Sequence, residues 1–311
     1  MTFEFREPRR EDAPLLIGLS GGSGAGKTYT ACLLARGLAG GQPFALIDTE
    51  NGRALHYADF FPDMRHTHLR EPYAPARYAE AIKAADASFP VIVVDSASHE
   101  YEGEGGVLRI QEDELARLGG GDNVKMLSWA KAKGEHKAYV RRLLQTKAHV
   151  ILCMRAEDKI EIVDDPDRPG KKKVIEKPSL VGAHGWIPIM EKRLPFELTL
   201  NLLLTPDAPG VAKPIKVPEQ LKAMVPIDRP LDEQVGRLLG EWASGAAAQG
   251  HSPSGLSMVE LKLWIANESV DTESLAEIAK RLFPSGTGFK SLTDPQRLQI
   301  REEYEREPAH V

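Results

Sequence analysis

One stretch, from Ile17 to Thr28, restricts the fold of this chain more than any other. It reads IGLSGGSGAGKT, an apolar run that breaks into a glycine-rich loop ending in a lysine and a threonine. Residues 15–19 have the pattern of a buried strand and residues 29–38 that of a helix, so the loop joins a strand end to a helix start. Glycines let backbone N–H groups surround an anion, the lysine ammonium reaches outer phosphates, and the threonine hydroxyl can ligate Mg²⁺. The spacing GxxxxGK[ST] therefore predicts a nucleoside triphosphate site.

The predicted nucleotide-binding residues are consecutive and form this loop. They are Gly21, Gly22, Ser23, Gly24, Ala25, Gly26, Lys27 and Thr28. Lys27 is also predicted to assist catalysis through its charge, and Thr28 to be a Mg²⁺ ligand. A glycine-rich turn that matches by chance is the alternative, and the strand and helix on either side count against it.

A loop of this kind works with a carboxylate at the end of a nearby strand, which holds Mg²⁺ or its water. Residues 91–94 (VIVV) read as a buried strand, and Asp95 follows them directly. We therefore predict that Asp95 is a Mg²⁺-site residue together with Thr28. An aspartate that merely ends a strand in a turn is the alternative.

The base that activates water must come from elsewhere, because Ser96 and not a glutamate follows Asp95. Glu50 closely follows the strand predicted at 43–47. It would lie beside Asp95 if that strand and the strand at 91–94 were neighbours. Glu100 and Glu102, just past Asp95, are its rivals.

Strands and helices alternate along most of the chain. Further strands are predicted at 43–47, 91–94 and 148–154, and helices at 76–87 and in two stretches within 106–146. The alternation predicts an α/β fold with a mainly parallel sheet covered by helices on both faces. Strands at 197–204 and 212–217, joined by a PDAPG turn, are predicted to finish the sheet antiparallel before a closing helix at 231–248.

Two segments depart from this alternation. Within an insertion at about 157–178, two polar arms flank DDPDRPG and predict a protruding hairpin at 159–177. Residues 244–255 (SGAAAQGHSPSG) read as a linker between a core at 1–243 and a small helical module at 256–311. Helices are predicted there at 257–267, 272–283 and 293–306, the last capped by Thr293 or Asp294.

Charge and cysteine content limit the partners and the compartment. The net charge of −5 provides no global basic field, so any nucleic-acid contact is expected to be local. Cys32 and Cys153 lie far apart in apolar surroundings without metal-ligand spacing, which predicts buried thiols of a reducing compartment. No apolar run approaches the ~18 residues of a membrane span and no signal-peptide pattern is present, so the cytoplasm is the expected location and no membrane partner is expected.

The order of these parts resembles the RecA-type recombinase core. GGSGAGKT, LIDTE at 46–50 and VIVVDSAS at 91–98 carry the resemblance, which covers roughly residues 14–220. It implies a RecA-like P-loop NTPase core that uses ATP and Mg²⁺, with Glu50 as catalytic base and Asp95 as the Mg²⁺-site acid. It also implies that Tyr57, seven residues after Glu50, stacks on adenine; an ordinary amphipathic aromatic is the alternative.

More closely, the chain is similar to phage-encoded RecA-like ATPases often labelled AAA-family ATP-binding proteins, a group that includes Sak-type single-strand annealing proteins. The similarity is carried by IDTENGRALHYAD (47–59), DSASHEYEGEGG (95–106), Trp129 with His136, and a strand ending in Met154-Arg155. In the RecA-type recombinases this strand usually ends in a Gln or Asn sensor, which Met154-Arg155 replaces here. Arg155 is predicted to supply catalytic charge at the γ-phosphate, with a solvated strand-end arginine as the alternative.

The resemblance also bears on assembly. Lys213 and Lys216 lie near the last strand, where RecA-like assemblies place lysines that reach the neighbouring subunit's nucleotide. It thus implies a homo-oligomer, although ordinary surface lysines are the alternative reading.

The predicted hairpin lies where RecA-type proteins contact DNA, and its cations are Arg168, Lys171, Lys172, Lys173 and Lys177. Contacts to DNA phosphates are expected there. Asp164, Asp165 and Asp167 nearly cancel this charge, however, and no aromatic is interleaved for base stacking. Ion-paired arms that keep an exposed edge soluble are the alternative.

These observations predict an ATPase of phage DNA recombination or replication that binds single-stranded DNA and assists annealing or strand pairing. A P-loop small-molecule kinase is one alternative, although no arginine-rich lid is evident, and a GTPase is disfavoured because no NKxD-like guanine reader is present. An ATP-gated scaffold or loader is another. Residues 256–311 carry 7 Lys/Arg against 10 Asp/Glu, which suits a contact with another replication or recombination protein.

Two remaining groups have ordinary explanations. His66 and His68 share a strand face, but no third ligand is in view, so no zinc site is expected. Trp129 could contact a base or a partner, yet a tryptophan on an amphipathic helix is more often part of a core.

Overall fold

The computed structural model describes residues 13–158, 160–164, 168, 170–176, 185–245, 261, 265, 271–284, 289 and 292–306. The chain divides into two units, residues 1–245 and 246–311. The predicted linker and the predicted helix at 257–267 fall mostly outside the described residues.

The first unit is built on the apolar runs seen in the sequence, which form one sheet in the order β10-β9-β1-β5-β4-β2-β3. The strands from β9 to β3 are parallel, and β10 is antiparallel to β9, which confirms the predicted mainly parallel sheet with an antiparallel finish. A short strand, β8 (Trp186–Pro188), pairs with the end of β5. The main strands are β1 (Leu16–Gly21), β2 (Phe44–Asp48), β3 (Met64–His68), β4 (Val91–Asp95), β5 (His149–Asp158), β9 (Leu200–Thr205) and β10 (Ala208–Lys216).

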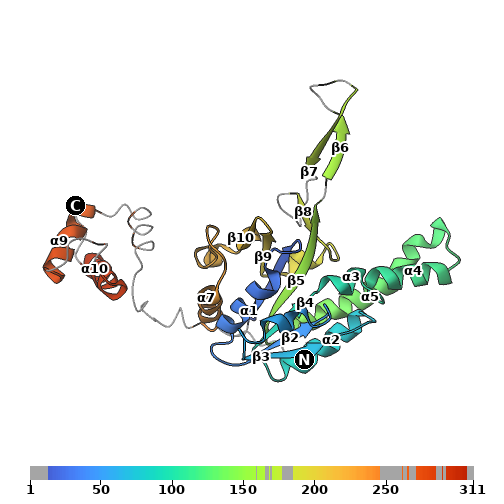
Figure 1. Cartoon of the computed structure of the whole chain (residues 1–311), viewed down its shortest axis with the longest axis horizontal. Helices are drawn as coiled ribbons and strands as arrows, with labels where there is room; N and C mark the ends of the chain where they lie inside the picture. Colours follow the sequence, from blue (N-terminus) through green and yellow to red (C-terminus); the bar gives the residue numbers. More distant parts are fainter. Residues whose placement is uncertain are drawn as a thin grey trace, which may run out of the picture. The chain divides into compact units, whose positions relative to one another are not determined.

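Helices cover both faces of this sheet, as Figure 1 shows. Because side chains alternate along a strand, Val91 and Val93 of β4 pack in the core shared with α1 (Lys27–Leu38) and α7 (Glu233–Ala243). Ile92 and Val94 pack in the opposite core, with α2 (Pro75–Asp86) and α5 (Asp122–Leu144). The continuous apolar runs therefore correspond to strands buried on both sides.

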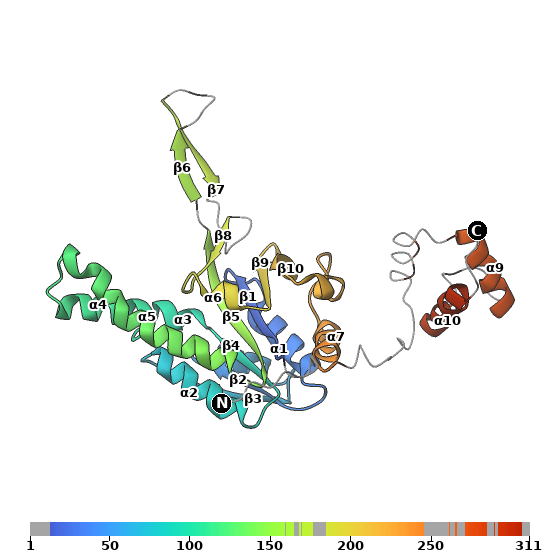
Figure 2. The ribbon, with the colours of Figure 1, turned by 180° about the vertical axis from the view of Figure 1, so that it is seen from behind.

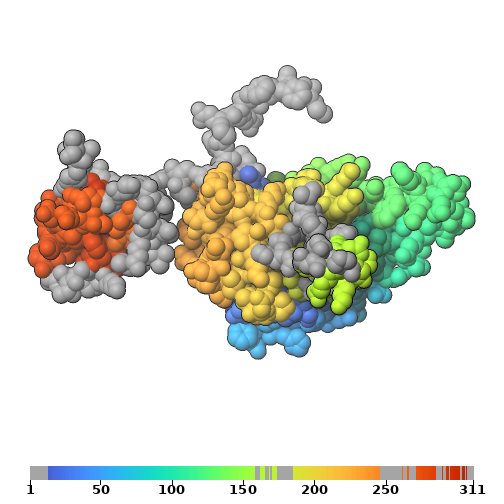
Figure 3. Space-filling model, turned by 90° about the horizontal axis from the view of Figure 1, so that it is seen from above, coloured from blue at the N-terminus to red at the C-terminus, as the bar shows by residue number. Residues whose placement is uncertain are grey.

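Two parts of this unit extend beyond the sheet: a hairpin (Figure 1) and a helical pair, the green projection at one side of Figure 3. One is the predicted hairpin, in which β6 (Ile160–Asp164) pairs antiparallel with β7 (Lys172–Glu176) shortly after β5 ends. The other is the helical pair formed by α4 (Val107–Arg117) and the first part of α5. The shorter connecting elements are 3₁₀ helix η2 (Arg53–Tyr57), α3 (Ser98–Glu102), α6 (Leu194–Glu197) and 3₁₀ helix η3 (Glu219–Met224).

Two predicted boundaries were wrong. The strand expected from residue 197 begins at Leu200, because Leu194–Glu197 forms helix α6 with a proline in its first turn. The helix expected at 231–248 runs from Glu233 to Ala243. The Asp232 side chain accepts a hydrogen bond from the Val235 N–H and caps its start, whereas Gly245, with φ of 75°, lies just past its end.

The second unit has its own small core, which contains Leu261, Leu275, Ile278, Leu292 and Ile300. Helix α9 (Thr272–Leu282) is capped by Asp271, whose carboxylate accepts from the N–H groups of Glu273 and Ser274. Thr293 precedes α10 (Asp294–Arg306), and its N–H donates to Gln296 Oε1 at 2.8 Å. No helix in the described part of the chain is both long enough and apolar enough to cross a membrane.

We expect Gly236→Ala to destabilise the first unit by about 2 kcal/mol, because a Cβ there would collide with the Leu34 carbonyl oxygen where α7 crosses α1. Gly240→Ala is the matched control, since its Cβ would meet the nearest atom, Leu38 O, at 3.4 Å. The control should gain about 0.5 kcal/mol from its higher helix propensity. Urea unfolding of both variants measures the difference, and equal stabilities would contradict this packing.

Candidate active site

The predicted site residues meet at one edge of the sheet because parallel strands deliver their carboxyl ends to the same edge. In register, Gly21 at the end of β1 lies opposite Arg155 of β5. Asp48 at the end of β2 lies opposite Asp95 at the end of β4. The neighbouring positions of β2 and β4, on which the prediction for Glu50 depended, are thus confirmed.

The glycine loop is shaped by positions that tolerate no side chain. Gly24 and Gly26 have φ values of 79° and 82°, in the left-handed region that L side chains rarely adopt. A Cβ on Gly21 would collide with the Leu204 carbonyl oxygen, and one on Gly22 would lie 2.9 Å from the Trp186 ring. Because these positions are glycines, no side chain covers the backbone N–H groups of the loop, and they can surround an anion. The loop stands directly before α1, whose first N–H groups carry partial positive charge.

Two loop residues have further roles in the described structure. Lys27, the first residue of α1, donates hydrogen bonds from Nζ to the carbonyl oxygens of Gly21 and Gly22, each at 2.9 Å. Its ammonium therefore lies across the mouth of the loop. Ala25 is buried in the core below, and its carbonyl oxygen accepts from the Gly210 N–H at 3.1 Å.

Thr28 and Asp95 lie in direct contact. The Thr28 hydroxyl donates to Asp95 Oδ2 at 2.6 Å, a short bond typical of a hydroxyl and a carboxylate. Burial raises the pKa of Asp95 to about 6; the Thr28 hydrogen bond lowers it and the nearby Glu50 carboxylate raises it. Two adjacent oxygen donors, one of them an acid that a cation would help to ionise, fit the ligand preference of Mg²⁺. The peptide bond from Asp95 to Ser96 is cis.

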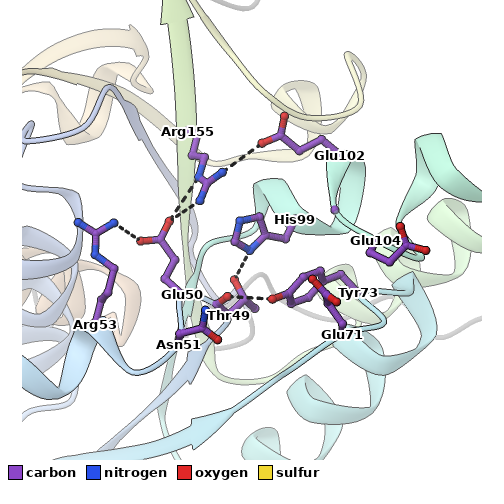
Figure 4. Close-up of a pocket in the computed structure, with 11 residues that line it drawn as sticks. Thr49, Glu50, Asn51, Arg53, Glu71, Tyr73, His99, Glu102, Glu104 and Arg155 are labelled. Carbon is purple, nitrogen blue, oxygen red and sulfur yellow. Dashed lines mark hydrogen bonds and ion pairs between the residues drawn. The ribbon is translucent and has the colours of Figure 1, made fainter.

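Glu50 is held between two arginines, as Figure 4 shows. Arg53 donates from Nη1 to Oε2 at 3.1 Å, and Arg155 donates from Nη2 to Oε1 at 3.1 Å. Arg155 also lies 3.6 Å from a carboxylate oxygen of Glu102. Sequence reasoning missed Arg53, because a lone arginine in a loop gives no signal of what it contacts.

Asp48 shapes the loop that carries Glu50. Its buried carboxylate accepts from the N–H groups of Glu50 at 2.6 Å and Ala54 at 3.2 Å. His66 Nε2 lies 3.1 Å from the same carboxylate, and the rings of His66 and His68 have centroids 4.6 Å apart. These histidines therefore support the loop; in the described residues no group of three or more His, Cys, Asp or Glu could hold a metal.

Hydrogen bonds also join the strand ends to one another. The Thr49 N–H donates to the Asp95 carbonyl oxygen at 2.7 Å, and the Ser96 N–H donates to Thr49 Oγ1 at 2.8 Å. The Arg155 N–H donates to Ser98 Oγ at 2.9 Å. Because each bond crosses between two strand ends, the carboxylates and the arginine are fixed relative to one another.

A cavity of about 600 Å³ brings most of the predicted residues together. Its lining includes Gly21, Gly22, Ser23, Gly24, Gly26, Lys27, Thr28, Glu50, Tyr57, Asp95 and Arg155, together with Arg53 and His56. The Tyr57 ring lies 5.5 Å from that of Tyr29, and its stacking on adenine remains a prediction. A second cavity of about 520 Å³ shares Glu50, Arg53 and Arg155 with the first and adds Glu71, Glu102 and Glu104.

Other residues singled out from the sequence lie outside this cavity. Glu100 is buried and accepts a hydrogen bond from His136 Nδ1 at 3.0 Å, so it does not line the cavity. Lys213 lies 3.7 Å from Asp207, and Lys216 donates to the carbonyl oxygens of Phe196 and Leu198. On the hairpin, Lys172 pairs with Asp164 at 2.6 Å; the exposed Arg168, Lys171 and Lys173 lie on the same hairpin, and Asp165, Asp167 and Lys177 are outside the described residues.

Cys32 and Cys153 are both buried free thiols, which confirms their predicted burial. Burial, followed by the nearby Asp95 charge, raises the pKa of both thiols. They remain protonated near neutral pH and act as small core residues behind the cavity.

The fold and the glycine loop define the class of the protein: an α/β P-loop domain with charged groups around one cavity at the carboxyl edge of its sheet. Residues 13–180, more than half of the chain, match the model of the AAA domain family. The chain belongs to that family. A comparison with curated proteins gave no match.

We expect Asp95→Asn to stabilise the protein at neutral pH. The Asp95 carboxyl has a pKa of about 6 in the folded protein, above its ordinary value of 3.8. The contribution of this carboxyl to the free energy of unfolding is therefore fully present below about pH 4 and is lost as the pH rises through 6. The variant should exceed the wild type by up to about 3 kcal/mol at pH 7.5, with the difference vanishing near pH 4. Denaturant unfolding across this range measures the effect, and a constant difference would contradict it.

Proposed function

We propose that this protein is a RecA-like ATPase of phage DNA recombination or replication, related to the Sak-type annealing group, that binds single-stranded DNA and assists annealing or strand pairing. The observation that carries the proposal is that Glu50, Asp95 and Arg155 line one cavity with the glycine loop. Arg155 lies on β5, the strand that leads into the projecting hairpin. The strand that borders the proposed ATP site is therefore followed directly in sequence by the hairpin that carries the proposed DNA contact.

In this proposal each residue has a separate task. The glycine loop and Lys27 bind and neutralise the phosphates of ATP, and Thr28 and Asp95 would hold Mg²⁺. When bound, Mg²⁺ supplies positive charge that stabilises the transferring phosphoryl group. Glu50 orients and deprotonates the attacking water, and Arg155 stabilises the charge that develops on the outer phosphate.

The contacts of Glu50 support its choice as the base over its rivals. Glu50 lines the nucleotide cavity, whereas Glu100 is occupied by His136 in the interior. Glu102 lines the second cavity, on the other side of Arg155. Because both oxygens of Glu50 are engaged by arginines, movement of Arg155 toward a phosphate would release one of them for water.

The proposed DNA contact rests on the hairpin. Its exposed cations, Arg168, Lys171, Lys172 and Lys173, lie on an arm that projects from the ATPase core (Figure 1). Phosphate contacts from such an arm would be local, in keeping with the net negative charge of the chain. As part of the proposal, the protein acts as a homo-oligomer in the cytoplasm of a host cell.

ATP turnover with and without single-stranded DNA tests this proposal. We expect DNA to stimulate the wild type, and Glu50→Gln to lower kcat by about 100-fold or more while retaining ATP binding. Glu102→Gln is the matched control, because it removes a carboxylate on the other side of Arg155 and should stay within a few-fold of the wild type. Equal losses of kcat in both variants would contradict the role of Glu50 as the base. Turnover that does not change when DNA is added would contradict the DNA function but not the ATPase function.

A second candidate function is an ATP-gated scaffold or loader that binds another replication protein. The observation that favours it is the second unit, which has its own core and capped helices and carries more acidic than basic residues. Such a surface suits a protein contact better than a grip on DNA.

Removing residues 246–311 separates the two candidates. The leading proposal predicts that residues 1–245 still anneal complementary strands at a rate within a few-fold of the full chain, because the ATP site and the hairpin both lie in the first unit. A strand-annealing assay with ATP turnover as the folding control measures this. Loss of annealing with turnover intact would favour the scaffold or loader.

A further inference from the structure

Helix α5 concentrates positive charge in a chain that is negative as a whole. It carries six basic residues, Lys125, Lys131, Lys133, Lys137, Arg141 and Arg142, against the two acids Asp122 and Glu135. The whole chain has a net charge of −5. The excess of positive charge on α5 is therefore a local feature that the overall composition does not predict.

Part of this charge lies along one line of the helix. Trp129, Lys133, Lys137 and Arg141 follow at intervals of four residues, which places them on one side of α5; we call them the α5 stripe. The three cations are exposed and Trp129 is half-buried. The side that faces the core carries Ala132, His136, Tyr139 and Leu143. Figure 2 shows α5 running from its junction with α4 back along the face of the sheet.

A groove runs beside the stripe. It has a volume of about 220 Å³ and is lined by Lys133 and Lys137 of α5 and by Arg193, just before α6. Glu191 and Glu197 also line it, and Glu191 lies 3.9 Å from His136 at the bottom. The groove therefore brings together cations from two segments that are distant in sequence.

The cations of the stripe are available to a partner. In the described part of the chain, no ion pair joins Lys133, Lys137 or Arg141 to a carboxylate, whereas the neighbouring Arg142 lies 3.9 Å from Asp86. On the hairpin, by contrast, Lys172 is already paired with Asp164. The Lys133 ammonium lies 5.7 Å from the centre of the Trp129 ring, so a flat aromatic surface adjoins the charge.

We propose that the α5 stripe, together with Arg193, binds the phosphate backbone of a single-stranded nucleic acid. The inference rests on the proposed function for its ligand and adds a surface that is separate from the hairpin. Four residues of helix rise about 6 Å, so the stripe presents cations at regular intervals to a backbone that carries one negative charge per nucleotide. Trp129 offers a face on which one base stacks.

The test is the salt dependence of binding of a fluorescent 30-nucleotide single strand, measured by anisotropy. The stripe variant is Lys133→Gln, Lys137→Gln and Arg141→Gln combined. Removal of three phosphate contacts should reduce the slope of log K against log salt by about 2 and raise the Kd at least tenfold at moderate salt. ATP turnover without nucleic acid, which these residues do not serve, confirms that the variant is folded.

The control neutralises three cations on the opposite side of the sheet: Lys222→Gln, Arg229→Gln and Arg237→Gln combined. Unlike the stripe cations, Lys222 and Arg229 are ion-paired, with Glu219 and Asp232. A second comparison neutralises Lys171, Lys172 and Lys173 on the hairpin. The proposal requires that the control leave the slope unchanged, and the hairpin variant shows what that arm contributes independently. Trp129→Leu should weaken binding with little change in slope, because it removes stacking and no charge.

The outcomes separate the proposals. A wild type that binds no single strand would overturn the proposed DNA function itself. A wild type that binds, together with a stripe variant of unchanged slope and affinity, would overturn the stripe alone. Polyglutamate can be compared with unlabelled single strand as a competitor of the labelled strand. If polyglutamate displaces the labelled strand equally well, the stripe is a site for an acidic protein surface and not for nucleic acid.

Discussion

The hydrogen bond from Thr28 to Asp95 is the contact around which the candidate active site is arranged. It joins the first turn of α1 to the end of β4, although β5 lies between β1 and β4 in the sheet. For these side chains to meet, the glycine loop must turn back over the end of β5. The left-handed Gly24 and Gly26 permit that turn. The buried Asp95 carboxylate then lies where a phosphate-bound metal would need an oxygen ligand.

The position of β5 between β1 and β4 has a second consequence. Gly21 lies opposite Arg155 in register, and Arg155 reaches Glu50, which follows the end of β2. The glycine loop and the proposed base are therefore connected through one arginine. Arg155 lies on β5, and the hairpin follows this strand in sequence. The connection of the glycine loop to Glu50 through Arg155 is compatible with membership of the AAA domain family. It is also compatible with the proposed binding of single-stranded DNA.

Much of this site could be predicted from the sequence, because the glycine spacing and the strand ends are local patterns. A strand followed by Asp95 and another followed closely by Glu50 are enough to place both acids at one edge, once the strands are parallel neighbours. Arg53 on Glu50, Asp48 beneath the loop and Lys216 on the carbonyls before β9 were not predictable. Each of these contacts depends on how loops fold back. Helix α6 was missed because four residues give no helical period, and a continuous strand was the simpler reading.

We propose that Thr28 and Asp95 form one magnesium site with the glycine loop. Calorimetric binding of a non-hydrolysable ATP analogue, with and without Mg²⁺, tests it most directly in the wild type, Thr28→Ser and Thr28→Val. We expect Mg²⁺ to tighten binding about tenfold or more in the wild type and in the serine variant, which keeps the hydroxyl. The valine variant should lose this gain. An equal effect of Mg²⁺ in all three proteins would contradict it.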